Sequence, residues 1–247
     1  MLNKNSLNKA FIESFNDYAV QHNYIYLKKY DIYMKCTGTV LIKYFFVEKL
    51  SGLSKNEIGF SVSGNVKSIY SESLEKNEMT VTSIRNKQFI DIIKGYDNTY
   101  PHTYYCNNQN VKTVMEKAFS DAKSGILSGI ESVNSMGDYL DYCHRINTAQ
   151  IRLATDFCGD SLAMIVADDH YDMTNTFNEF MTSLECKYGI SYVNSVSKAY
   201  YTGLVEKVSL DRDKVFKNKD LYKKALDEAE KRKNTNLTVL RKLGLIT

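Results

Sequence analysis

The sequence predicts an α+β fold, in which an N-terminal helix packs on a mostly antiparallel β-meander and a mainly helical half follows. Apolar residues recur at three- and four-residue intervals over residues 6–21, as on one stripe of a helix. Strand-like runs separated by turn residues occupy residues 24–70, and helical patterns dominate after residue 101. We therefore expect residues 1–100 to form a helix and a sheet, and residues 101–247 a helical half, either as two domains or packed as one.

The first helix presents a continuous apolar stripe, which needs a surface to cover. The next residues supply a sheet, because residues 24–36 read as one long or two short strands and Thr37-Gly38 reads as a turn. The stripe consists of Leu7, Ala10, Phe11, Phe15, Tyr18 and Ala19.

Residues 39–49 form the strongest predicted strand. Its alternate side chains are largely apolar on both faces, so we expect it to be central, with the helical half covering the face that the first helix leaves open. Gly64-Asn65 predicts a two-residue hairpin loop between strands at residues 58–63 and 66–71. A further strand is expected at residues 79–84.

The second half carries several helical stripes. One runs from Val111 to Cys143, with breaks near Gly125, Gly129 and Gly137. Others lie at residues 177–189, 192–200 and 221–229.

Composition favours a folded cytosolic protein. Of the 247 residues 43% are hydrophobic, no run reaches the roughly 20 apolar residues of a membrane helix, and no signal-peptide core is present. The five cysteines are scattered, which fits reduced thiols. One proline, no tryptophan and 19 tyrosines indicate an AT-rich genome, and hence a low-GC bacterium or its phage.

Gly159-Asp160-Ser161-Leu162 matches the signature of the GDSL esterases, whose serine is a nucleophile activated by a histidine. That family places its Asp-x-x-His block far downstream. Here the last histidine is His170, preceded at the third position by Ala167. We therefore interpret Asp160 or Ser161 as a helix N-cap.

Two acidic segments suggest metal chemistry. The first has the spacing of a Mg²⁺-dependent nuclease core, with Asp168 or Asp169 followed by Glu185 and Lys187. Such a core needs Glu185 on a strand, whereas the apolar pattern before Glu185 is helical. The run from Asp168 to Asp172 includes His170 and could hold a divalent ion, but a polar turn is favoured because no glycine shapes a ligand loop. Cys143-His144 and Cys158 lack the paired spacing of a zinc site, so we expect no metal and no cofactor.

Two groups of residues are candidates for binding. Tyrosines in the first strands could form an aromatic face for a protein partner, although their alternation also suits sheet packing. Residues 207–247 hold 12 Lys or Arg against 6 Asp or Glu, which could contact nucleic-acid phosphates or form a solvated face. The candidates are Tyr24, Tyr26, Tyr30, Tyr33 and Tyr44 for the first, and Lys223, Lys224, Lys231 and Arg232 for the second.

The order of elements also resembles that of an uncharacterised bacterial family known only as a domain of unknown function. The resemblance rests on Asn23-Tyr24 after the leading helix, Phe45-Phe46 in the central strand, the strands at residues 26–29 and 58–62, and a closing Leu243-Gly244-Leu245. It covers residues 6–72 and the C-terminus, and it implies no catalytic residues.

The sequence predicts a non-enzymatic cytosolic module that binds another protein, in an immunity, defence or counter-defence setting of a bacterium or phage. The Mg²⁺-dependent nuclease and a nucleic-acid-binding protein are the alternatives. We expect no membrane contact, and the sequence leaves the oligomeric state open.

Overall fold

The computed structural model describes residues 4–38, 40–54, 57–70, 83–94, 98–139, 141–142 and 219–247. The chain divides into two compact units. The first comprises Met1–Lys67, Thr80–Asn134 and Leu240–Thr247, and the second Ser68–Met79 and Ser135–Val239. The helices that follow the sheet up to residue 134 thus belong to the same unit as the sheet.

The sheet of the first unit is an antiparallel meander, as the sequence predicts. Its strand order is β1-β2-β3-β4-β5, and a sixth strand, β6, also pairs with β4. β5 pairs with residues 63–64 of β4 and β6 with residues 58–60, so the two short strands occupy different stretches of β4. The strands are β1 (Ile25–Leu27), β2 (Ile32–Thr37), β3 (Leu41–Ser54), β4 (Glu57–Ser68), β5 (Ile84–Arg85) and β6 (Tyr104–Cys106).

The leading helix α1 (Lys4–Gln21) buries the whole stripe that the sequence predicts. Phe11 packs edge-on against Tyr33 of β2, with ring centroids 5.4 Å apart, and Phe15 lies 5.8 Å from Phe45 of β3. Burying these aromatic rings supplies much of the apolar area that holds α1 to the sheet.

β3 is central, as its two apolar faces predict. It lies between β2 and β4, and its adjacent residues Tyr44 and Phe45, which point to opposite faces, are both buried. The predicted turn before it is also present, with Gly38 at a φ of 60°.

The hairpin predicted at Gly64-Asn65 is wrong, because β4 runs straight through these residues to Ser68. Gly64 serves a different purpose there. A Cβ at this position would lie 2.7 Å from Ile130 Cδ1 and 2.8 Å from the carbonyl oxygen of Tyr44. The glycine therefore allows close packing of a helix on the strand, which is the other common reason for glycine in a strand.

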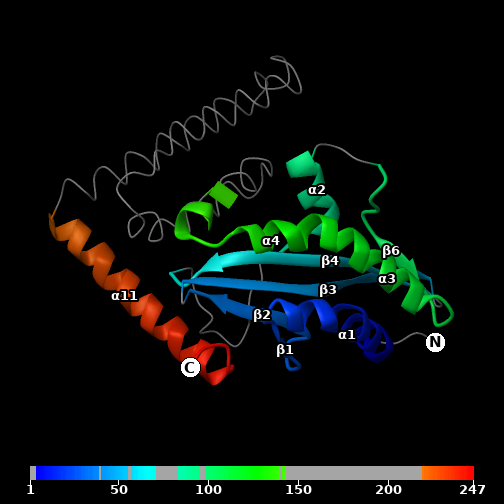
Figure 1. Cartoon of the computed structure of the whole chain (residues 1–247), viewed down its shortest axis with the longest axis horizontal. Helices are drawn as coiled ribbons and strands as arrows, with labels where there is room; N and C mark the ends of the chain where they lie inside the picture. Colours follow the sequence, from blue (N-terminus) through cyan, green and yellow to red (C-terminus); the bar gives the residue numbers. More distant parts are fainter. Residues whose placement is uncertain are drawn as a thin grey trace, which may run out of the picture. The chain divides into compact units, whose positions relative to one another are not determined.

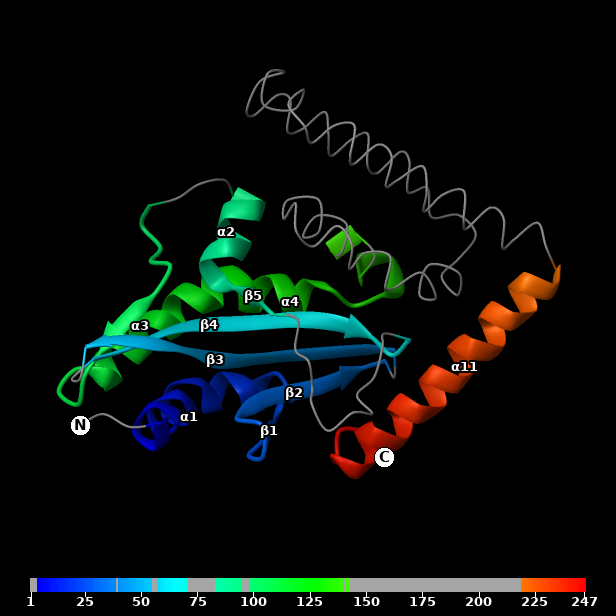
Figure 2. The same ribbon diagram turned by 180° about the vertical axis from the view of Figure 1, so that it is seen from behind.

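The helices after β6 lie on the same side of the sheet as α1, in the two opposite views of Figures 1 and 2. They are α3 (Val111–Ala122), the π-helical turn η1 (Lys123–Leu127) and α4 (Ser128–Ser132). Phe119 of α3 packs on Phe15 of α1 with ring centroids 4.8 Å apart. The expectation that this part of the helical half covers the opposite face is therefore wrong. The backbone departs from helical geometry at Gly125, but α3, η1 and α4 all stay on the α1 side of the sheet.

α2 (Asn86–Lys94) packs against η1 and α4 through these two glycines. A Cβ on Gly129 would overlap the ring of Phe89, with Cε1 and Cε2 at 2.7 Å, and a Cβ on Gly125 would meet Ile90 Cδ1 at 2.9 Å. Gly125 departs from helical geometry (φ −113°, ψ −110°), and the Asn86 side-chain oxygen accepts a hydrogen bond from the amide of Ile126 there. Two of the breaks that the sequence indicates, at Gly125 and Gly129, are thus the place where α2 packs closely on η1 and α4.

The final helix α11 runs over Lys219–Lys242, and Gly244, two residues after it, has the positive φ that suits the end of a helix. Within the second unit, the Asn236 amide donates a 2.6 Å hydrogen bond to the Ile69 carbonyl. None of the described helices has the length and apolarity needed to span a membrane.

Candidate functional site

A partly buried polar cluster lies between the end of α1, the end of α4 and strands β2 and β3 of the first unit. The end of α1 forms one side of it. Asn23 takes a left-handed conformation (φ 61°) directly after the helix, which is a geometry that asparagine tolerates. The chain then turns back, and the Tyr24 amide donates to the Ala19 carbonyl at 2.8 Å. This turn brings His22 and Tyr24 beside β2.

The end of α4 builds the opposite wall. The helix stops at Val133, whose backbone is extended, so the last helical carbonyls need donors from outside the helix. Lys43 of β3 supplies one: its ammonium is fully buried and donates to the Glu131 carbonyl at 3.2 Å and to Asn134 Oδ1 at 3.3 Å. A cation at a helix C-terminus is also favoured by the helix dipole.

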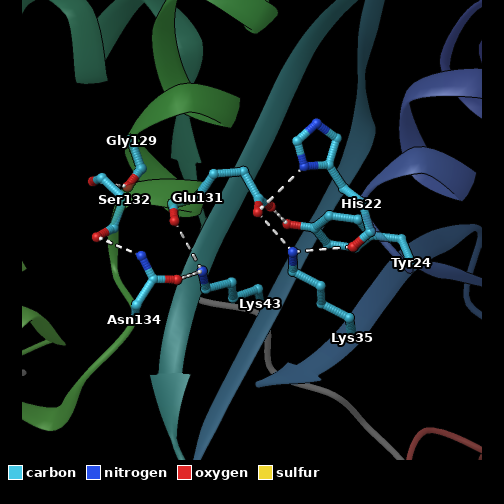
Figure 3. Close-up of polar contacts among 8 residues, drawn as sticks. All are labelled: His22, Tyr24, Lys35, Lys43, Gly129, Glu131, Ser132 and Asn134. Atoms are coloured by element: carbon cyan, nitrogen blue, oxygen red, sulfur yellow. Dashed lines mark hydrogen bonds and ion pairs between the residues drawn. The ribbon is translucent and has the colours of Figure 1, made fainter. Parts of the chain in front are cut away.

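The Glu131 carboxylate lies at the centre of the cluster (Figure 3). Tyr24 donates to Oε1 at 2.5 Å, and Lys35 of β2 donates to Oε2 at 2.7 Å. His22 Nδ1 is 3.5 Å from Oε2. Lys35 also donates to the His22 carbonyl and lies 4.5 Å above the Tyr24 ring, so one lysine joins three parts of the cluster.

These contacts move the pKa values of Glu131 and Tyr24 away from neutral. Burial alone would raise the pKa of Glu131, but hydrogen bonds from Lys35 and Tyr24, together with the charges of Lys35 and Lys43, hold it below its ordinary value. Burial, with the Glu131 charge and hydrogen bond, raises the pKa of Tyr24 well above 10.0. Glu131 is therefore fixed as a carboxylate and Tyr24 as a neutral phenol.

A second polar cluster lies on the other face of the sheet and connects β3, β4 and β5. Arg85 holds Glu48 in a two-point contact, with Nε to Oε2 at 3.0 Å and Nη2 to Oε1 at 3.1 Å. Ser61 and Ser63 of β4 donate to the same carboxylate at 3.4 and 3.3 Å. The Arg85 hydrogen bond, opposed by burial, lowers the pKa of Glu48.

The edge strand β1 carries a surface of a different kind. Val20, at the end of α1, is 63% exposed, and Ile25 of β1 is 42% exposed. Lys28 and Lys29, in the turn after β1, are exposed, and Lys29 lies 5.1 Å above the Tyr30 ring. We call the residues along this edge the β1 edge surface. Ile25 lies on one face of the sheet, and Tyr26 lies on the other face, with α1. The β1 edge surface comprises Val20, Ile25, Tyr26, Lys28, Lys29 and Tyr30.

The five candidate tyrosines do not form the single exposed aromatic face that the sequence suggests. Tyr24, Tyr33 and Tyr44 are buried, and the register places Tyr33 and Tyr44 on opposite faces of the sheet. Only Tyr26 and Tyr30 are half-exposed, and Tyr26 donates to Asp31 at 3.1 Å. The tyrosines thus alternate between the two faces as in an ordinary sheet, and only Tyr26 and Tyr30 of the five reach the surface, beside β1.

Among the basic candidates on α11, Lys223, Lys224 and Lys231 are exposed and Arg232 is half-buried. Exposed acids, including Asp227 and Glu230, lie between them. The nuclease candidates Asp168, Asp169, Glu185 and Lys187 lie outside the described residues, as do Gly159-Asp160-Ser161-Leu162, His170 and Cys158. In the described part of the chain, no three His, Cys, Asp or Glu side chains are grouped to hold a metal ion.

Sequence reasoning missed Glu131 and the role of Lys43. Lys43 did carry a signal, since a lysine within a strand that is apolar on both faces must find acceptors in the interior. Glu131 carried none, because its partners Tyr24 and Lys35 lie 107 and 96 residues away.

Comparison of the chain with protein-family models, with curated proteins and with solved structures finds no match. The described part of the first unit has an α+β fold, in which α1, α3 and α4 pack on one face of an antiparallel sheet. The resemblance to an uncharacterised bacterial family stays a prediction.

Proposed function

We propose that this chain is a non-enzymatic protein-binding module that contacts its partner through the β1 edge surface. The observation that carries the proposal is the exposure of Val20 and Ile25 beside two half-exposed tyrosines. Aliphatic and tyrosine side chains with a charged rim are the composition of a protein interface. The hydrogen bonds of Glu131 to Tyr24 and Lys35, next to this edge, support it, because a surface that is already held in place loses less conformational entropy on binding.

The chemistry of the polar clusters favours binding over catalysis. A general acid or base works best with a pKa near the working pH, so active sites push pKa values toward neutral. The shifts in the described residues run the other way: Glu48 and Glu131 are lowered, and burial raises Tyr33 to about 12 and the Cys106 thiol to about 11. Such groups keep their ordinary charge at pH 7 and act as fixed contacts.

As the biological setting we propose a cytosolic immunity, defence or counter-defence component of a bacterium or phage. The composition supports the bacterial or phage source alone, because a single proline, no tryptophan and abundant tyrosine, lysine and asparagine indicate an AT-rich genome. The genes encoded beside this one test it: neighbours with defence or phage functions are expected, and a housekeeping operon would contradict it.

Photo-crosslinking tests the proposed binding surface. A benzophenone amino acid at Val20 is expected to crosslink to one discrete protein in a lysate of the organism that encodes the chain. Thr113 is the matched control, because it is also an exposed, β-branched residue on a helix of the same unit. Equal crosslinking from both positions, or none from Val20, would contradict the proposal.

Nucleic-acid binding by α11 is a second candidate, favoured by the exposure of Lys223, Lys224 and Lys231. Phosphate contacts release counterions, so binding to a DNA duplex should weaken steeply between low and moderate salt. Charge reversal of Lys223 and Lys224 should weaken it further. Absent or salt-independent binding would remove this candidate.

A further inference from the structure

No strand of the described residues pairs with the outer edge of β1, and we propose that this edge accepts an extended, acidic segment of a partner protein as an added strand. This inference rests on the proposed protein-binding function and specifies the partner chemistry. In the strand order β1 is terminal, and within the described structure it pairs only with β2. Its outward backbone groups are therefore of the kind that bind an added strand.

The side chains beside this edge provide apolar contacts on both sides of an added strand. Ile25 lies opposite Met34 in the β1–β2 register, and Tyr26 lies opposite Tyr33. Because neighbouring side chains alternate in direction, Ile25 and Tyr26 point to opposite faces of the sheet. A strand added at this edge would place its own alternate side chains against Ile25 on one face and Tyr26 on the other.

Charge selects the partner. Residues 18–30 contain no acidic side chain, while Lys28 and Lys29 are both exposed in the turn that follows β1. The flanking Asp31 already accepts a hydrogen bond from Tyr26. An acidic segment would neutralise the two lysines, whereas residues 18–30 of a second copy of this chain have no acidic side chain with which to do so.

The edge is held in place before any partner arrives. Lys35 of β2 and Tyr24, which immediately precedes β1, both bind the Glu131 carboxylate, at 2.7 and 2.5 Å. The Tyr26–Asp31 hydrogen bond also fixes the turn at the far end of β1. An edge that is already ordered binds a flexible segment at a lower entropic cost.

The short strand sets the expected strength. β1 has three residues, so an added strand gains few backbone hydrogen bonds, and the contact falls in the class of small, transient interfaces below roughly 1,200 Å². We expect a dissociation constant on the order of micromolar, with a large electrostatic share.

The test uses the full chain and a random heptapeptide library displayed on yeast. Enriched peptides are expected to combine acidic residues with alternating β-branched or aromatic residues. Lys28→Glu with Lys29→Glu should weaken binding of an enriched peptide at least about tenfold, since two favourable charge contacts become repulsive. The matched control, Lys112→Glu with Lys123→Glu, reverses two other exposed lysines of the same unit and should leave binding unchanged.

Amide hydrogen exchange then tests the strand addition itself. On binding of an enriched peptide, exchange should slow in Ile25–Leu27 and stay unchanged in Tyr104–Cys106, a strand of the same length on β4. Protection elsewhere, or none, would overturn strand addition even if the peptide binds.

Other outcomes also overturn the inference. Enriched peptides without acidic residues, or binding that ignores the Lys28 and Lys29 reversal, would exclude an acidic partner. A dimer in light scattering that Ile25→Ser dissolves would assign the edge to a second copy. If no peptide is enriched while Val20 still crosslinks to a partner, the strand inference fails and the proposed function stands.

Discussion

Two contacts hold the same stretch of chain, residues 125–134, and they do so by opposite means. On the side toward α2, Gly125 and Gly129 have no side chain, and Phe89 and Ile90 fill the space directly against the backbone. On the side toward the sheet, Glu131 and Asn134 carry polar groups that meet Lys35 and Lys43. The first contact depends on shape, so an added methyl group would disrupt it. The second depends on charge, so removing one charged partner would leave the other without its ion pair.

The difference between them also decides what the sequence can reveal. A glycine four residues from another in a helical pattern is visible in the sequence as a break, and Gly125 and Gly129 were identified in that way. A carboxylate has no such local mark, so its role depends on which distant residues the fold brings near. Substitutions on each side of this segment separate the two kinds of contact.

The largest effect is expected from Gly129→Ala. The new methyl group would overlap the Phe89 ring, so α2 must shift, at a cost of about 2–3 kcal/mol in the free energy of unfolding. Urea unfolding measures it. Gly137→Ala is the control, because its nearest neighbour would be Ser135 Oγ at 3.7 Å, and equal losses in both variants would contradict the tight crossing.

A somewhat smaller loss is expected from Glu131→Gln. The neutral amide leaves Lys35, which is 12% exposed, without its charged partner, at a cost of about 2 kcal/mol. The same unfolding measurement applies, with Glu116→Gln on the exposed face of α3 as the control. If Glu131→Gln is as stable as the parent, the cluster does not anchor α4.

Glu48→Gln should cost less, although Glu48 meets an arginine through two hydrogen bonds. Arg85 is 37% exposed and can return to water, so we expect a loss of about 0.5–1 kcal/mol. A thermal unfolding curve of this variant beside that of Glu131→Gln gives the comparison. A Glu48→Gln loss larger than that of Glu131→Gln would reverse the ranking of the two clusters.

The pH dependence of stability sharpens the same comparison with the smallest changes. Both carboxylates have folded pKa values below their ordinary 4.5, so their contribution is present above that value and is lost as pH falls through the folded pKa. Tyr33 and Cys106 have raised pKa values, so their contribution is present at neutral pH and is lost as the solution becomes strongly alkaline.

Urea unfolding between about pH 7 and pH 3 checks the acid side. The stability difference between the parent and Glu131→Gln should shrink as pH falls, because protonation removes the same charge that the substitution removes. A difference that stays constant would show that the Glu131 charge contributes nothing.

Much of the fold could be predicted because its signals are local. The stripe from Leu7 to Ala19 predicts α1, and the two apolar faces of β3 predict its central place. Gly64 misled because glycine serves both turns and close packing, and only the position of Ile130, far along the chain, distinguishes them.

Little of the candidate site could be predicted, for the same physical reason. Glu131 lies 88 to 107 positions from its hydrogen-bond partners Lys43, Lys35 and Tyr24, and no periodicity links these residues. The sequence predicts part of the β1 edge surface, because Tyr26 and Tyr30 are among its candidate residues. It does not predict the burial of Tyr33 and Tyr44, which depends on the register of the sheet. Exposure of Val20 depends on how α1 packs on the sheet, and exposure of Ile25 depends on β1 being the terminal strand, and the sequence specifies neither.

The protonation state of Glu131 is the most direct test of whether the polar cluster is a fixed support or a reactive site. Carbon-detected NMR of the Glu131 side-chain carboxyl in the full chain, titrated across the acid and neutral range, measures it. We expect one transition below the ordinary value of 4.5 and no change near neutral pH. A transition above about pH 6 would mark Glu131 as a proton-transfer group and contradict a non-enzymatic module.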